Sequence, residues 1–193
     1  MQLLRNKEGN ITPLGEIILK ICLIFAGFFY DKKYLKGRYF NNCFTGIKWV
    51  LHGIIFQKIL GYNRNISFPC SFKISISNSD NIDYHPNDLN NFQSPGCYFQ
   101  NFAGHITIGE GTYIAPNVGI ITANHNINDL DKHCEGKDVI IGKKCWLGMN
   151  SVILPGVALG DDTIVGAGAI VTKSFPEGKV VIAGNPAQII KKI

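Results

Sequence analysis

Several features that would assign the chain to a common class are missing from its sequence. The 193 residues contain six cysteines, but no two of them form a C-x-x-C pair. This spacing fits neither a zinc ribbon nor a compact disulfide framework, so the cysteines are predicted to be reduced thiols in a reducing compartment. They are Cys22, Cys43, Cys70, Cys97, Cys134 and Cys145.

A long uncharged apolar run is also missing. The most apolar stretch, residues 11–30, is interrupted by Glu16 and Lys20, and only residues 21–30 are uncharged. Because about 20 apolar residues are needed to span a bilayer, no transmembrane helix is predicted. No small-x-small cleavage site precedes Asp31, so a signal peptide is not expected either. A cytoplasmic protein is therefore predicted.

The positive charge is not gathered into one long basic segment. The formal net charge is +5, with one cluster of basic residues at 32–38 and another at 173–192. Solvated surface is the ordinary explanation of such clusters, and a nucleic-acid partner is not predicted. For the second cluster, the more specific functional interpretation is contact with an anionic cofactor.

What the sequence does contain is a repeat of six residues. Read from Ile141, the blocks are IGKKCW, LGMNSV, ILPGVA, LGDDTI, VGAGAI and VTKSFP, and the register extends back through IGEGTY, IAPNVG and IITANH. Every block opens with Ile, Leu or Val, and the residue four later is mostly small or β-branched. The opening residues are Ile108, Ile114, Ile120, Ile141, Leu147, Ile153, Leu159, Val165 and Val171.

A sustained period of six fits neither a helix, which needs apolar spacings of three and four, nor a simple alternating strand. A parallel β-helix explains it, because three six-residue sides make one coil and the opening aliphatic residues stack inside. The glycine that often follows fits a turn where a side chain would clash or where φ must be positive.

These blocks resemble the hexapeptide-repeat acyltransferases. From Asn91 to Ile193 the chain is similar to galactoside, maltose and serine O-acetyltransferases and to the sugar O-acetyltransferases of capsule and lipopolysaccharide synthesis. The resemblance implies a mainly β fold, a left-handed parallel β-helix, whose handedness rests on the resemblance alone. It also implies a homotrimer that uses acetyl-CoA, a carbohydrate acceptor and no metal.

Three segments are expected along the chain. Residues 1–65 form a helical segment, with one helix over 11–30 that begins at Thr12 and Pro13 and a second over 46–61. Residues 66–186 form the β-helix, and residues 187–193 a short capping helix. The first helix either packs on the β-helix or a neighbouring subunit, or rests on an anionic membrane surface.

The repeat is interrupted between Ile120 and Ile141, where 21 residues stand in place of six. The extra residues, at about 126–138, are predicted to leave the coil as a polar loop, and loops on a rigid scaffold often carry function. In the resembling enzymes such an extension reaches over the active site of a neighbouring subunit.

His125, at the base of this loop, is the candidate catalytic residue. A lone histidine is weak evidence, but its position matches the catalytic histidine of the resembling family. An imidazole can take the proton of a sugar hydroxyl as that oxygen attacks acetyl-CoA, and return it to the leaving thiolate. The group that orients His125 stays open among a backbone carbonyl, Asp129, Asp131 and Glu135.

The other site residues follow from matching positions in the resembling enzymes. Met149 stands where the family often has a small residue, so its backbone rather than its side chain is suited to the cofactor. The amine of Lys173 suits the cofactor's phosphates as a point charge. The implied cofactor contacts are Trp146, Met149, Ala167, Thr172, Lys173 and Lys191. Asp83 and His85 lie in a turn-rich segment and are interpreted either as solvated turn residues or as acceptor contacts, and Asn124 is the third candidate acceptor contact.

The predicted function is acetyl transfer from acetyl-CoA to a sugar hydroxyl in the synthesis of a surface polysaccharide. One alternative is acetylation of a small acceptor, such as serine or a xenobiotic, and another is a non-catalytic scaffold. A zinc-dependent carbonic anhydrase is disfavoured, because His125 and His133 have no histidine companions on adjacent coils.

Overall fold

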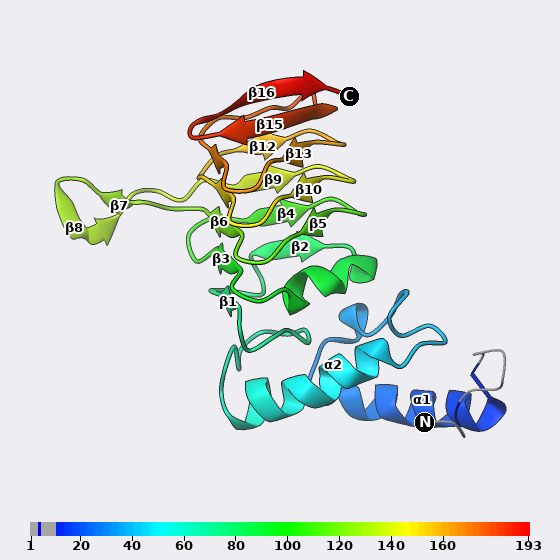
Figure 1. Cartoon of the computed structure of the whole chain (residues 1–193). Coiled ribbons are helices and arrows are strands. Elements are labelled where there is room, and N and C mark those ends of the chain that lie inside the picture. Colours follow the sequence, from blue (N-terminus) through cyan, green and yellow to red (C-terminus); the bar gives the residue numbers. More distant parts are fainter. Residues whose placement is uncertain (1–3, 5–10) are drawn as a thin grey trace. The chain divides into compact units, whose positions relative to one another are not determined.

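The computed structural model describes residue 4 and residues 11–193, and it divides the chain into two compact units, Met1–Phe72 and Lys73–Ile193. The first unit is helical and the second is built from short strands (Figure 1). None of the described helices has both the length and the apolar character that a membrane span requires.

Two helices dominate the N-terminal unit. Helix α1 (Pro13–Ala26) begins as predicted, with the Thr12 hydroxyl accepting a hydrogen bond from the Gly15 amide at 3.2 Å. A short 3₁₀ turn, η1 (Lys32–Tyr34), follows. Helix α2 (Thr45–Gly53) continues directly into a π-helical segment, η2 (Ile54–Ile59), so the second predicted helix is present with an irregular second half.

A buried glutamine joins these elements. The Gln57 side-chain oxygen accepts hydrogen bonds from the Tyr30 hydroxyl at 3.0 Å and from the Cys70 amide at 2.9 Å. Its amide nitrogen donates to the Phe68 carbonyl at 3.2 Å. Both polar atoms of the buried Gln57 amide are therefore hydrogen bonded, and these bonds hold helix and loop together. In the same region, burial raises the pKa of the Cys70 thiol to about 12.

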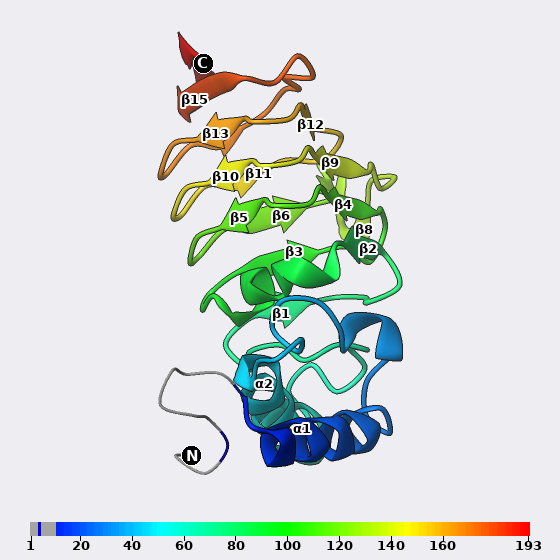
Figure 2. The ribbon, with the colours of Figure 1, turned by 90° about the vertical axis from the view of Figure 1, so that its right-hand side faces the viewer.

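The second unit is a three-sided parallel β-helix (Figure 2). A 3₁₀ segment, η3 (Pro86–Gln93), lies between its early strands. The first side is β1 (Ser75–Ile76), β3 (Tyr98–Gln100), β6 (Gly119–Ile121), β11 (Val152–Ile153) and β14 (Ile170–Val171). The second is β2 (Ile82–Tyr84), β4 (Ile106–Ile108), β9 (Val139–Ile141) and β12 (Ala158–Leu159). The third is β5 (Tyr113–Ile114), β10 (Trp146–Leu147), β13 (Ile164–Val165), β15 (Val180–Gly184) and β16 (Ala187–Lys192).

The strand register confirms the predicted repeat. Residues one coil apart pair with each other, so Ile120 pairs with Ile153 and Ile153 with Val171. All nine block-opening residues are buried, none with more than 4% of its surface exposed. The stacked aliphatic side chains form the core of the coil, and their burial is the main stabilising contribution of the repeat.

The corners explain the glycines of the repeat. A Cβ atom on Gly109 would lie 2.5 Å from the backbone of the next coil, and one on Gly142 would lie 2.6 Å from the Asp161 amide. Positive φ occurs instead two positions further along, as at Asn117 (59°) and Lys144 (53°). The glycine that follows the aliphatic residue is therefore explained by close approach between coils and not by a positive φ.

The predicted C-terminal capping helix is wrong. Residues 187–192 form strand β16, which pairs antiparallel with β15. Gly184, at a φ of 101°, begins the turn that reverses the chain. Seven residues are too few to form a stable helix, whereas the open edge of β15 offers unpaired backbone groups and the segment contains three β-branched isoleucines.

Candidate active site

The inserted segment is a β-hairpin that projects from the coil, here called the arm (residues 125–138; Figure 1). Its strands are β7 (His125–Asn126) and β8 (Asp129–His133). The Asn128 amide donates to the Asn126 side chain at 2.8 Å in the turn, and the Lys137 amide donates to the Thr122 carbonyl at 2.8 Å at the base. The predicted protrusion is therefore present, as a hairpin rather than an irregular loop.

The imidazole of His125 is oriented by the arm itself. Its Nδ1 lies 2.7 Å from the Leu130 carbonyl oxygen. Because a carbonyl only accepts, Nδ1 must carry the proton, and in the neutral ring Nε2 is then left as the proton acceptor. Among the orienting groups left open by the sequence, the backbone carbonyl is the one found. The Asp129 carboxylate instead pairs with Lys132 at 2.8 Å.

A stack of rings connects His125 to the coil. His125 and His133 pair across the hairpin, with ring centroids 4.3 Å apart. The rings of His133 and Phe102 are T-shaped to each other, with centroids 4.9 Å apart. From the sequence, His133 was considered in the disfavoured zinc site, and Phe102 was not singled out. The pairing register of the hairpin, which places His133 opposite His125, is the signal that would have identified His133.

A buried side chain braces the base of the arm. The Gln100 side-chain oxygen accepts from the amides of Thr122 at 3.0 Å and Ala123 at 2.9 Å, and its nitrogen donates to the Ala123 carbonyl at 3.0 Å. Asn124, a predicted acceptor contact, is exposed, and its carbonyl accepts from the Cys134 amide at 2.8 Å. Gln100 thus fixes the backbone two residues before His125, a role that sequence reasoning missed.

The two other predicted acceptor residues lie lower on the coil. Asp83, on β2, holds the His105 ring, with Oδ2 3.0 Å from Nε2. The His105 amide in turn donates to the carboxylate of Asp138 at the end of the arm, at 2.8 Å. His85 accepts from the Asn87 amide at 3.2 Å and so caps η3. Among the described residues no hydrogen bond, ion pair or ring contact joins Asp83 or His85 to His125.

Four of the predicted cofactor residues lie on or beside one outer face of the coil. On that face Trp146 pairs with Ile164, Ile164 with Val181, and Val181 with Lys191. The side chains of Trp146 and Lys191 therefore stand on the same side of the sheet. Trp146 is 55% exposed. At the adjoining corner Met149 and Ala167 lie on successive coils, and the Gly168 amide donates to the Met149 carbonyl at 2.8 Å.

The remaining two lie at a different corner. Thr172 and Lys173 follow β14, and β14 is in the same sheet as β6, which leads into the arm. The Lys173 amine donates to the Gln188 side chain on β16 at 3.1 Å. The structure therefore divides the predicted cofactor residues between two corners rather than gathering them at one point. In the described part of the chain, no group of three or more metal-ligating side chains is found.

Comparison with known proteins identifies the repeat. Residues 138–173 match the family model described as bacterial transferase hexapeptide (six repeats). The chain carries the bacterial transferase hexapeptide repeat. This hexapeptide chain is 42% identical over 91 residues to galactoside O-acetyltransferase of Escherichia coli K12, covering 46% of this chain and 44% of that protein.

A second relative of the hexapeptide chain is the putative lipopolysaccharide biosynthesis O-acetyl transferase WbbJ of the same strain. The two are 41% identical over 99 residues, 45% of this chain and 50% of WbbJ. The chain thus spans about half the length of these curated relatives.

Similarity to a solved structure extends further along the hexapeptide chain. A galactoside acetyltransferase solved in complex with coenzyme A matches 94% of this chain and 82% of its own, with a TM-score of 0.53 and 20% identity. At that identity the match shows the fold, which is the left-handed β-helix expected from the resemblance.

Proposed function

We propose that this chain is an acetyl-CoA-dependent O-acetyltransferase that acts on a sugar hydroxyl, with His125 as the general base. The observation that carries the proposal is the 2.7 Å hydrogen bond from Nδ1 of His125 to the Leu130 carbonyl. It holds the ring on an exposed arm in the tautomer whose Nε2 can accept a proton.

In the proposed reaction Nε2 of His125 takes the hydroxyl proton while the sugar oxygen attacks the carbonyl carbon of the acetyl thioester. The tetrahedral intermediate then collapses, the carbon–sulfur bond breaks, and the imidazolium returns the proton to the departing thiolate. No residue of the chain is acetylated. A backbone amide at a coil corner is the proposed donor to the oxyanion.

For acetyl-CoA we propose the outer face and corners of the coil. Support comes from the exposed ring of Trp146, from the adjoining corner of Met149 and Ala167, and from the coenzyme A bound by the structurally similar galactoside acetyltransferase. Lys173 and Lys191 are the proposed phosphate contacts, with Thr172 beside Lys173.

For the acceptor we propose a carbohydrate of a bacterial surface polysaccharide. The relatives support this class, since one is a galactoside O-acetyltransferase and another is a putative lipopolysaccharide O-acetyl transferase. Asn124 is exposed beside His125 and is the nearest proposed contact. Asp83 and His85 are proposed to contact a part of the acceptor that lies farther from the reacting hydroxyl.

We propose that the chain assembles as a homotrimer in which each arm rests on a neighbouring copy. The support is a pair of apolar side chains on the otherwise polar arm, since Ile127 is 90% and Leu130 70% exposed. Apolar side chains on a projecting hairpin are expected to be covered by another surface. The proposed place of action is the cytoplasm, including the inner face of the membrane.

Release of thiol from acetyl-CoA, measured with a panel of sugars and bacterial surface glycans, tests the proposal. His125→Ala is expected to lower turnover by about 10²-fold or more, the scale for loss of a general base. The matched control is His52→Ala, since the His52 ring contacts the Phe56 ring in the N-terminal unit. Equal turnover by wild type and His125→Ala would remove His125 from the mechanism.

A further inference from the structure

Helix α1 turns an apolar face to solvent. Five aliphatic and aromatic side chains, each at least half exposed, are spaced by three, four, three and one residues and so share one face of the helix. They are Leu14, Ile17, Ile21, Ile24 and Phe25. On the opposite face Leu19 and Ala26 are buried in the unit. A helix on the surface of a soluble domain normally exposes polar residues, so the exposed face of α1 calls for a partner.

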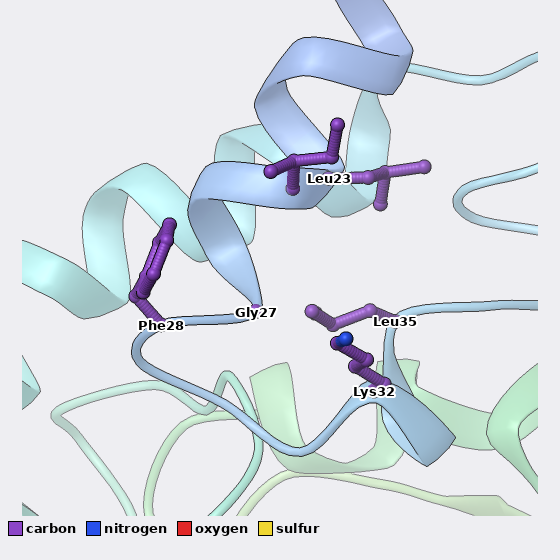
Figure 3. Close-up of a pocket in the computed structure, with 6 residues that line it drawn as sticks. Leu23, Gly27, Phe28, Lys32 and Leu35 are labelled. Carbon is purple, nitrogen blue, oxygen red and sulfur yellow. The ribbon is translucent and has the colours of Figure 1, made fainter.

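The apolar face continues beyond the end of α1. Phe28 is 80% exposed. Beside it lies a hollow of about 420 Å³ between the end of the helix and the following turn (Figure 3). Figure 3 shows the amine of Lys32 beside the side chain of Leu35, so a cation stands among the apolar lining groups. The lining residues are Leu23, Ile24, Gly27, Phe28, Lys32 and Leu35.

The charge of the chain is divided unequally between the two units. Residues 1–72 contain ten Lys and Arg against three Asp and Glu, a net charge of +7. Residues 73–193 contain nine against eleven, a net charge of −2. Lys20, Lys32 and Lys36 are exposed in the same unit as the apolar face. An apolar face in a strongly basic unit fits an apolar partner with an anionic surface.

We propose that the exposed face of α1 docks the N-terminal unit on an anionic lipid surface. Helix α1 lies in the plane of the interface, its apolar side chains enter the acyl region, and Lys32 and Lys36 contact lipid phosphates. A second copy of the chain is a poorer occupant, because it would bring two units of like charge together. The docking refines the proposed place of action, and its test does not depend on acetyl transfer.

Sedimentation of the full chain with lipid vesicles tests the charge requirement. Vesicles of phosphatidylglycerol and phosphatidylcholine are compared with vesicles of phosphatidylcholine alone. Lys32→Glu/Lys36→Glu is expected to weaken binding to the anionic vesicles by at least about tenfold, since each basic residue near such a surface contributes about fivefold. Lys143→Glu/Lys192→Glu changes the net charge equally in the other unit and should bind as wild type. Equal binding to neutral and anionic vesicles would contradict the proposal.

A second pair of variants tests the apolar face. Ile17→Ser/Ile21→Ser is expected to lose vesicle binding, while Ile140→Ser/Ile190→Ser, two exposed isoleucines of the other unit, keeps it. Circular dichroism confirms that the variants fold, and light scattering reports their oligomeric state. If the wild type binds no vesicles and Ile17→Ser/Ile21→Ser instead dissociates the oligomer, the face is a subunit contact and the lipid proposal fails.

Discussion

The imidazole of His125 is hydrogen bonded to the backbone of a residue on the facing strand of the same hairpin, the carbonyl of Leu130, at 2.7 Å. A carboxylate partner would also have fixed the tautomer, but it would have added a negative charge beside the ring. The carbonyl orients the imidazole ring without adding that charge. The orientation of the proposed base therefore depends on the register of the hairpin and not on any one side chain.

One prediction tests this dependence on register. Insertion of a single glycine after Asn128 shifts the facing strand by one residue, which turns the Leu130 carbonyl away from His125. We expect turnover to fall at least about tenfold with little change in acetyl-CoA binding, since a misplaced base loses most of its effect. Asp131→Ala, an exposed position on the same strand, keeps the strand length and the Leu130 carbonyl and is the matched control. Steady-state kinetics decide the matter, and full activity of the insertion variant would show that the carbonyl is not needed.

A second prediction concerns Gln100, whose buried side chain binds the amides of Thr122 and Ala123. Gln100→Leu leaves the Ala123 amide and carbonyl without this partner, while the Thr122 amide keeps its bond to the backbone carbonyl of residue 100. The free energy of unfolding should fall by about 2 to 4 kcal/mol. Gln188→Leu, on exposed β16, should change it by less than about 0.5 kcal/mol. In a Trp49→Phe background, the fluorescence of Trp146 during urea unfolding reports the β-helix unit alone. Similar midpoints for the two variants would rule out the bracing role.

The coil was predictable because its pattern is set by burial. Each block places one aliphatic residue inside, and Ile120, Ile153 and Val171 stack in the structure as the period of six requires. The arm has no such period, because its contacts are polar and local. The group that orients His125 is a carbonyl, which every residue possesses, so no side chain in the sequence marks it.

The C-terminal strand was unpredictable for another reason. Whether residues 187–193 form a helix or a strand depends on the free edge of β15, which exists only once the coil has formed. The role of Gln100 was unpredictable for the same reason, because its three backbone partners belong to the next coil. Contacts made between coils, rather than along the chain, are those that the sequence pattern does not reveal.

A third prediction follows from the cysteines. Burial raises the pKa of Cys70 to about 12, so at pH 8 almost all of this thiol is protonated and unreactive. Burial also raises the pKa values of Cys97 and Cys145, whereas Cys134 on the arm is exposed. Mass spectrometry after brief alkylation of the native protein should find Cys134 modified first and the three buried thiols only in urea. Early labelling of Cys70 would show that its site opens in the native state.

The last prediction tests whether the proposed site lies between copies of the chain. Two inactive variants are co-expressed: His125→Ala, which lacks the base, and Ala167→Trp, in which a large side chain obstructs the exposed corner beside Met149. If each site lay within one chain, every site in the mixed oligomer would contain one defect. If the arm of one copy serves the coil of the next, about a quarter of the sites in randomly mixed trimers combine an intact arm with an intact corner. We therefore expect the mixture to recover about that fraction of wild-type turnover, with each variant alone as the control. Because distinct affinity tags on the two variants isolate the mixed oligomers, an inactive mixed oligomer would place the site within a single chain.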